Sequence, residues 1–72
     1  QHGKHMLITK KFGQSVRVAR KEANLTQEEF ADLAGINRSH MGQIERGYKS
    51  PSLATIDLIA KALNCSVVQL LH

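Results

Sequence analysis

The spacing of apolar residues along the chain predicts short amphipathic helices. Across residues 10–23, apolar side chains recur at intervals of three and four, which places them on one face of a helix. The residues on that face are Phe12, Val16, Ala19 and Ala23. No stretch alternates apolar and polar residues over a useful length, so the pattern carries no strand signal. We therefore expect an all-α fold, in which Asn24 ends the first helix.

The second predicted helix has clear signals at both ends. Thr26 and Glu29 have the spacing of a capping box, in which each side chain binds the backbone N–H of the other residue. Gly35 supplies the left-handed conformation that ends a helix at low cost. The apolar positions between these ends predict an inward face made of Phe30, Leu33 and Ala34.

A third helix follows this glycine within two residues. Asn37 is a good N-cap, Met41 and Ile44 are expected to face inward, and Gly47 marks the end. Pro51 then predicts a loop, because proline has no backbone N–H and restricts the residue before it.

Two further helices complete the predicted fold. Ser52 begins the fourth helix, and Ser66 with Gln69 forms another capping box at the start of a short fifth one. The inward face of the fourth helix is predicted to hold Leu53, Ile56, Ala60 and Leu63, with Ile59 on its border. The fifth helix is expected to contribute apolar cover from Val67, Leu70 and Leu71.

Length and composition are those of one small domain. The chain has 72 residues and a formal net charge of +4, and its single cysteine, Cys65, cannot form an internal disulfide. Residues 1–5 look like an expression-tag remnant, which leaves residues 6–72 as the domain. No apolar run approaches the roughly 18 residues of a membrane span. These features predict a protein without membrane association, in a reducing, cytoplasmic compartment.

Positive charge is concentrated in the first part of the domain. Residues 6–25 contain five basic residues and one acidic residue, which favours a polyanionic partner. Lys10, Lys11 and Arg17 in this part are expected to attract that partner at long range rather than to contact it directly.

Several short motifs at fixed spacing resemble those of the Cro/repressor-type helix-turn-helix DNA-binding domain, often called the Xre family. The likeness covers residues 12–71. The motifs are Leu25-Thr26-Gln27, Phe30-Ala31, Leu33-Ala34-Gly35-Ile36, Ile44-Glu45-Arg46-Gly47 and Pro51-Ser52-Leu53. The resemblance implies a compact five-helix fold like that of lambda repressor, with the helix-turn-helix formed by the second and third helices. In this motif the second of the two helices enters the DNA major groove with its first residues on base edges.

The resemblance also implies roles for individual residues. The residues expected to contact bases are Asn37, Arg38, Ser39 and Gln43. The residues expected to contact phosphates are Thr26, Gln27, His40, Arg46, Tyr48 and Lys49. Arg20 and Glu45 match positions that form a shielded salt bridge, so we expect their role to be structural.

The implied function is that of a sequence-specific transcriptional regulator of double-stranded DNA. A homodimer on an inverted-repeat operator is expected, and Leu58, Ile59 and Val68 are candidates for the dimer interface because they lie off the inward faces. Repression and activation both fit, as do a phage repressor, a restriction–modification controller and an antitoxin. The alternative is an interaction module, antitoxin-like or coactivator-like, that keeps the fold and binds a second protein.

Catalytic and cofactor chemistry has little support in the sequence. Ser39 and His40 are adjacent, so on a helix they point about 100° apart and cannot act as a nucleophile and its base. His40 has no second ligand at metal-binding spacing. We expect no enzyme activity, no metal and no cofactor.

Overall fold

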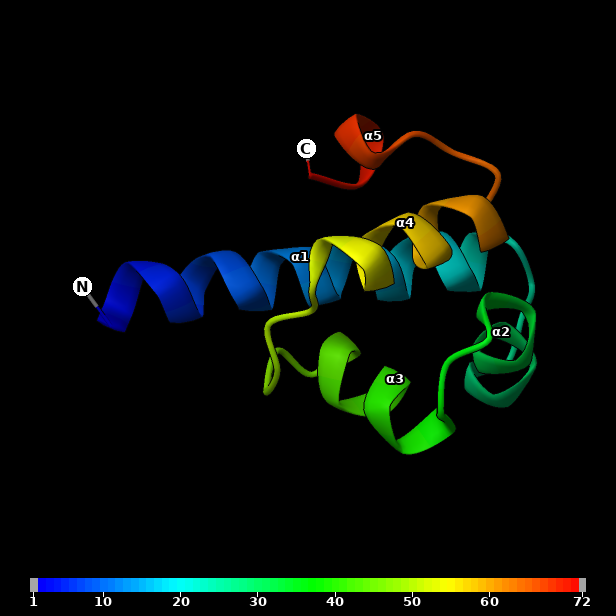
Figure 1. Ribbon diagram of the computed structural model, residues 1–72, viewed down its shortest axis with the longest axis horizontal. Helices are drawn as coiled ribbons and strands as arrows, with labels where there is room; N and C mark the ends of the chain where they lie inside the picture. The colour runs from blue at the N-terminus through cyan, green and yellow to red at the C-terminus, as the bar shows by residue number, and fades with distance from the viewer. Residues whose placement is uncertain (1, 72) are drawn as a thin grey trace.

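The computed structural model describes the backbone of residues 2–71 and the side chains of residues 7–71. It contains five helices: α1 (His2–Glu22), α2 (Gln27–Ala34), α3 (Arg38–Glu45), α4 (Leu53–Ala62) and α5 (Val67–Leu71) (Figure 1). No strand occurs within this part of the chain, so the all-α prediction is confirmed. The side chains of the predicted tag remnant, residues 1–5, and the terminal His72 lie outside the described part.

Helix α1 is longer than the apolar pattern predicts. It begins at His2 rather than near residue 10, and it includes Leu7 and Ile8, whose side chains are exposed. The pattern detects only the buried face, which starts further along the helix. Extending a helix that has already nucleated needs no such face, because each added residue gains a backbone hydrogen bond. At the other end Asn24 adopts a left-handed conformation, with φ 60°, and the preceding Ala23 is exposed rather than inward as predicted.

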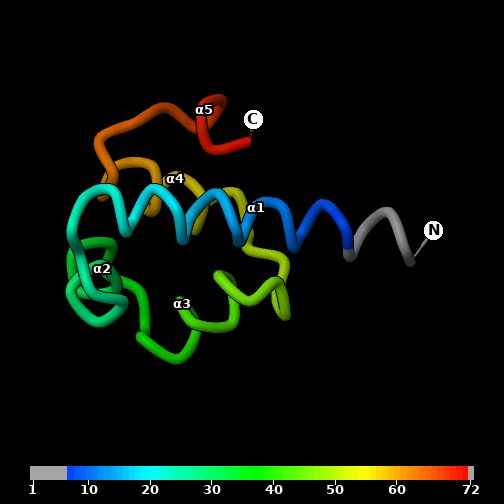
Figure 2. Tube along the Cα trace, turned by 180° about the vertical axis from the view of Figure 1, so that it is seen from behind, coloured from blue at the N-terminus to red at the C-terminus, as the bar shows by residue number. Residues whose placement is uncertain are grey.

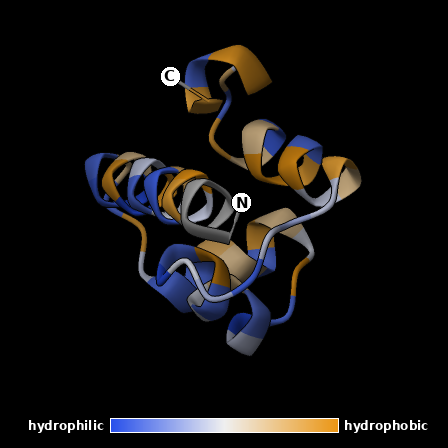
Figure 3. Cartoon of the chain, turned by 90° about the vertical axis from the view of Figure 1, so that its left-hand side faces the viewer, coloured by the Kyte–Doolittle hydropathy of each residue, from blue (hydrophilic) through white to orange (hydrophobic). Residues whose placement is uncertain are grey.

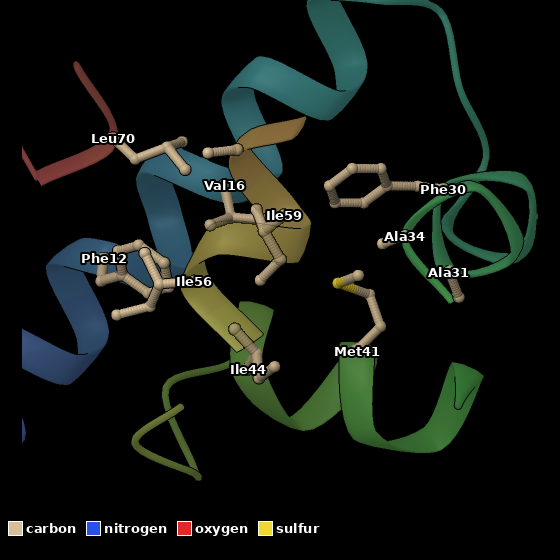
Figure 4. Packing of buried hydrophobic residues seen from close by; sticks show 11 residues of the cluster. Phe12, Val16, Phe30, Ala31, Ala34, Met41, Ile44, Ile56, Ile59 and Leu70 are labelled. Carbon is tan, nitrogen blue, oxygen red and sulfur yellow. The ribbon is translucent and has the colours of Figure 1, made fainter. Parts of the chain in front are cut away.

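The five helices enclose one apolar core (Figure 4). The largest side chains with almost no exposed surface come from α1 to α4: Val16, Phe30, Met41, Ile44 and Ile59. Helix α3 packs against α1 and α2, α4 packs against α2, and α5 packs against α1 and α4. Figure 2 shows the same arrangement from behind: α5 lies on one side of α1, α2 and α3 lie on the other side, and α4 overlaps α1 in this view. No helix within the described residues has the length and apolar character needed to cross a bilayer.

The inward face of α2 differs from the prediction by one position. Ala31 is buried beside Phe30 and Ala34, whereas Leu33 is exposed. At 100° per residue, Phe30, Ala31 and Ala34 occupy one continuous stripe, and Leu33 lies about 100° from its centre. A helix of eight residues has too few apolar positions to define its inward face from hydrophobicity alone.

The apolar residues of α4 and α5 also divide differently from the prediction. Ile59 is not on a border but is fully buried, so it cannot serve as the exposed dimer contact that we expected. Leu53, predicted to face inward, is 81% exposed because it is the first residue of α4 and lies beyond the packed turns. Leu71, at the end of α5, is exposed as well, whereas Leu70 is buried as expected.

Candidate nucleic-acid interface

A glycine turn sets the direction in which α3 leaves α2. Gly35 has φ 69°, a left-handed conformation in which residues with a Cβ are strained, and its N–H donates to the last carbonyls of α2. Asn37 then caps α3: its Oδ1 accepts from the N–H of Ser39 at 2.8 Å and from that of His40 at 3.3 Å. The capping box of α2, between Thr26 and Glu29, is present too. The predicted ends of this helix pair are confirmed, except that α3 stops at Glu45, two residues early.

Helix α3 has one buried face and one exposed face. Met41 and Ile44 have no exposed surface, whereas Arg38 and Ser39 in the first turn are exposed and Gln43 is partly exposed. The exposed side chains surround an open hollow of about 250 Å³. Its lining consists of Gln27, Arg38, Ser39, Gly42, Gln43 and Arg46. The structure thus brings together three of the four predicted base-contacting residues with two of the predicted phosphate-contacting ones.

The fourth predicted base contact, Asn37, already has a structural task. Its Oδ1 is occupied by the two backbone N–H groups of the cap, which leaves the side-chain nitrogen as the atom that could reach a base. The contact of Asn37 with DNA stays a prediction, and it is now limited to the side-chain nitrogen.

A buried ion pair joins α1 to α3 beneath this surface. Arg20 Nε donates to Glu45 Oε2 at 2.7 Å, and Arg20 Nη2 donates to Glu45 Oε1 at 3.0 Å. Arg20 Nη1 also donates to the carbonyl of Leu25 at 2.9 Å, and Gln27 Nε2 donates to Glu45 Oε1 at 3.3 Å. The two charged side chains are only 11% and 3% exposed. The predicted salt bridge is therefore present and is shielded from water, while its structural role stays a prediction.

The other candidates for phosphate contacts do not line the hollow at the front of α3, apart from Arg46. The guanidinium of Arg46 lies over the ring of Tyr48, 5.3 Å from its centroid, in a cation–π contact. Lys49 is exposed in the turn after α3. His40 is half-buried, and it lines neither the hollow at the front of α3 nor the one between α1 and the end of α3 that is described below. The Thr26 hydroxyl accepts the Glu29 N–H of the cap at 3.1 Å. The DNA contacts of all these residues stay predictions.

A second, larger hollow contains residues that the sequence pattern did not place at the interface. It measures about 620 Å³ and lies between α1 and the end of α3, with Lys10, Gln14 and Arg17 in its wall. These three residues have the spacing i, i+4 and i+7, which puts them on one face of a helix. That spacing is visible in the sequence, but only the packing of α1 against α3 shows that the face borders the interface.

A capped helix, held outward by a glycine turn and carrying polar side chains beside cationic ones, defines a helix-turn-helix DNA-binding domain. The chain belongs to the helix-turn-helix family: the family model matches residues 16–70. The predicted resemblance and the predicted fold are confirmed.

Several similar proteins have names that describe gene regulators. The control protein C.SmaI of Serratia marcescens is 39% identical over 66 residues, covering 92% of this chain and 79% of that protein. An immunity repressor of Bacillus phage phi105 is 42% identical over 55 residues, but the chain spans only 38% of its length. In the crystal structure of the restriction-modification controller protein C.AhdI from Aeromonas hydrophila, the matching chain is 40% identical with a TM-score of 0.84. That match covers 86% of this chain and 94% of the other.

Proposed function

We propose that this protein is a sequence-specific transcriptional regulator that binds an inverted-repeat operator as a homodimer, with α3 in the major groove. The observation that carries the proposal is the hollow at the front of α3, where Arg38, Ser39 and Gln43 are presented together beside Gln27 and Arg46. A helix used only to close a core would not need this set of side chains on its exposed face. The place of action is the cytoplasm of a bacterial or phage-infected cell, where such an operator would be found.

Each exposed side chain of α3 has a matching group on a base edge. The guanidinium of Arg38 suits the O6 and N7 acceptors of guanine, and the amide of Gln43 suits the N6 and N7 of adenine. Ser39, with a hydroxyl that both donates and accepts, fits either kind of base. A good bidentate pair contributes about 1–3 kcal/mol of discrimination against the wrong base.

The residues at both ends of the helix pair would fix the register on the DNA backbone. Thr26 and Gln27 stand at the N-terminus of α2, where the helix dipole favours a phosphate. Arg46, Tyr48 and Lys49 follow α3, and His40 lies on the helix between the two groups. Such contacts position the protein but carry little sequence information.

The surface formed by α4 and α5 is the proposed dimer interface. Leu58 is 42% exposed and Val68 is 65% exposed, and Leu53 and Leu71 add to the apolar surface of these two helices. Figure 3 shows hydrophobic positions along α4 and α5, whereas α2 and α3 carry hydrophilic ones on the opposite side. An isologous interface between two copies would relate their α3 helices by a two-fold axis, which matches an inverted repeat whose half-sites lie one turn of DNA apart.

Dimerisation can be tested with two matched substitutions. Val68→Glu places a charge on the α5 surface, and Val18→Glu places the same charge on α1, where the valine is similarly exposed. Light scattering after size exclusion is expected to give a monomer mass for Val68→Glu and a dimer mass for Val18→Glu and the wild type. Equal masses for both variants would contradict the placement of the interface.

Sequence-specific binding can be tested by selecting duplexes from a random pool. The selected duplex is expected to bind at least about tenfold more tightly than random DNA at about 0.15 M salt, the lower end of what direct readout provides. A protein that prefers no duplex would contradict the proposal. Strong stabilisation by a second protein would then point to an interaction module that uses the α4–α5 surface.

A further inference from the structure

Helix α1 lies unusually close to the end of α3 and the turn after it. A Cβ at Gly13 would overlap the carbonyl oxygens of Ile44 and Glu45, so the two helices approach backbone to backbone at this point. Gly47, in the turn after α3, approaches α1 in the same way: its Cβ would lie 2.8 Å from the Cα of Lys10. These two contacts hold the Lys10 face of α1 beside the residues that follow α3.

The resulting hollow is strongly cationic. Of the described residues that line it, four are basic and one, Glu45, is acidic. Glu45 is already paired with Arg20, so its charge is neutralised within the floor of the hollow. The other three cations, Lys10, Arg17 and Arg46, form no ion pair with any described carboxylate. An anion in this hollow would meet uncompensated positive charge on several sides.

This hollow is continuous with the surface that α3 presents to DNA. Gln27 and Arg46 line both hollows, so the two hollows are adjacent, and a polymer lying across the front of α3 has the α1 hollow next to it. The phosphodiester backbone has that continuity and carries one charge per nucleotide.

We propose that Lys10 and Arg17 of α1 bind a phosphate of the DNA backbone beyond the stretch that α3 reads. The proposal rests on the proposed function, which it deepens by making α1 a direct part of the DNA-binding surface instead of a source of long-range attraction. Gln14, between these two cations on the same face, offers an amide N–H to the same phosphate.

The salt dependence of binding measures such interactions with phosphate. On duplex DNA, the slope of log K against log salt concentration changes by about 0.9 for each phosphate that the protein neutralises. The double variant Lys10→Ala with Arg17→Ala is therefore expected to have a slope shallower by about 0.9, the value for the one phosphate that the two cations share. The matched control is Lys11→Ala, because Lys11 is the next residue of α1 and is also exposed but lines a different hollow. It is expected to leave the slope unchanged.

A random-sequence duplex is the right probe, because phosphates do not depend on sequence. Neutral methylphosphonate linkages, introduced one at a time into the selected duplex, on which the protein has a fixed register, locate the bound phosphate: the wild type should lose affinity at a linkage flanking the α3 footprint, and the double variant should be insensitive there. Equal slopes for the double variant and for Lys11→Ala would overturn the proposal, whether both match the wild type or both are shallower by the same amount.

A free phosphate could occupy the same cationic hollow. Titration of inorganic phosphate, followed by the NMR signal of the Arg17 side-chain N–H, separates the two sources. Saturation by inorganic phosphate with no change in the DNA salt slopes would overturn the proposal in favour of a small ligand. A wild type that binds random DNA but selects no sequence would contradict the proposed function alone, since the slopes still report on this phosphate.

Discussion

The two sides of the molecule are held together by different kinds of interaction, as their ion pairs show. On the α1–α3 side, Arg20 and Glu45 are buried, bidentate and bonded to two further groups. On the α4 side, Lys61 and Asp57 form a pair at 3.1 Å whose side chains are 75% and 53% exposed. Water screens the exposed Lys61–Asp57 pair. The buried Arg20–Glu45 pair has lost its hydrogen bonds to water, so it depends on protein groups to replace them.

The same difference extends to the surfaces of the two sides. The α2–α3 side has polar side chains and cationic hollows, which suit a charged and patterned partner. The α4–α5 side has exposed leucine and valine, which suit an apolar partner such as a second copy of this chain. A buried polar network fixes the geometry of the surface that we propose to read bases, while apolar packing is sufficient on the side that we propose to form the dimer.

The largest expected effect comes from removing one partner of the buried pair. Glu45→Ala should lower the free energy of unfolding by about 3–5 kcal/mol, because the charge of Arg20 would remain buried and unpaired. Asp57→Ala should cost only about 0.3–0.5 kcal/mol, as expected for an exposed i, i+4 pair on a helix. Urea unfolding followed by circular dichroism measures both. Similar losses for the two variants would remove the distinction between the two sides.

Weak DNA binding by Glu45→Ala would not show that this residue touches DNA. The loss of stability alone lowers the folded population, so binding must be compared at a temperature where both proteins are folded.

The next effect concerns the two α4 residues whose positions differ from the prediction. Ile59→Ala should destabilise the fold by about 2–5 kcal/mol, since it leaves a cavity in the core. Leu53→Ala, at a largely exposed position, should change stability by no more than about 0.5 kcal/mol. Thermal or urea unfolding of the two variants tests whether Ile59 is in the core and Leu53 is on the surface. A larger loss at Leu53 would restore the inward face that the sequence pattern suggested.

A smaller effect separates the two glycines with positive φ. Gly35→Ala should cost about 1–2 kcal/mol from the left-handed backbone alone, because nothing lies within 4 Å of its added Cβ. Gly47→Ala should cost more, since its Cβ would also press on Lys10 of α1. Unfolding free energies for the two variants give the comparison. Equal losses of stability for the two variants would mean that Lys10 and α1 can shift to accommodate the added Cβ at no cost in free energy.

The sequence predicts much of the fold because local signals determine helix ends. Thr26, Asn37, Ser52 and Ser66 all cap the helices that they were expected to cap. These signals act within a few residues, so the sequence displays them directly.

Features that depend on packing between helices were harder to predict. Leu33, Leu53 and Ile59 are apolar residues for which only the neighbouring helices decide between core and surface. The Lys10 and Arg17 hollow is of the same kind, since it exists only because α1 meets the end of α3. The Arg20–Glu45 pair, 25 residues apart in the chain, was found through the family resemblance rather than from any local pattern.

The central claim is that the exposed front of α3 senses base identity, and one measurement tests it most directly. Binding of the wild type and of Arg38→Ala should be compared on the selected duplex and on every single base-pair change within it. Arg38→Ala is predicted to lose about 1–3 kcal/mol of discrimination at one base pair and to leave the other positions unaltered. A uniform loss across all duplexes would show that Arg38 contacts only the backbone, which would contradict the claim.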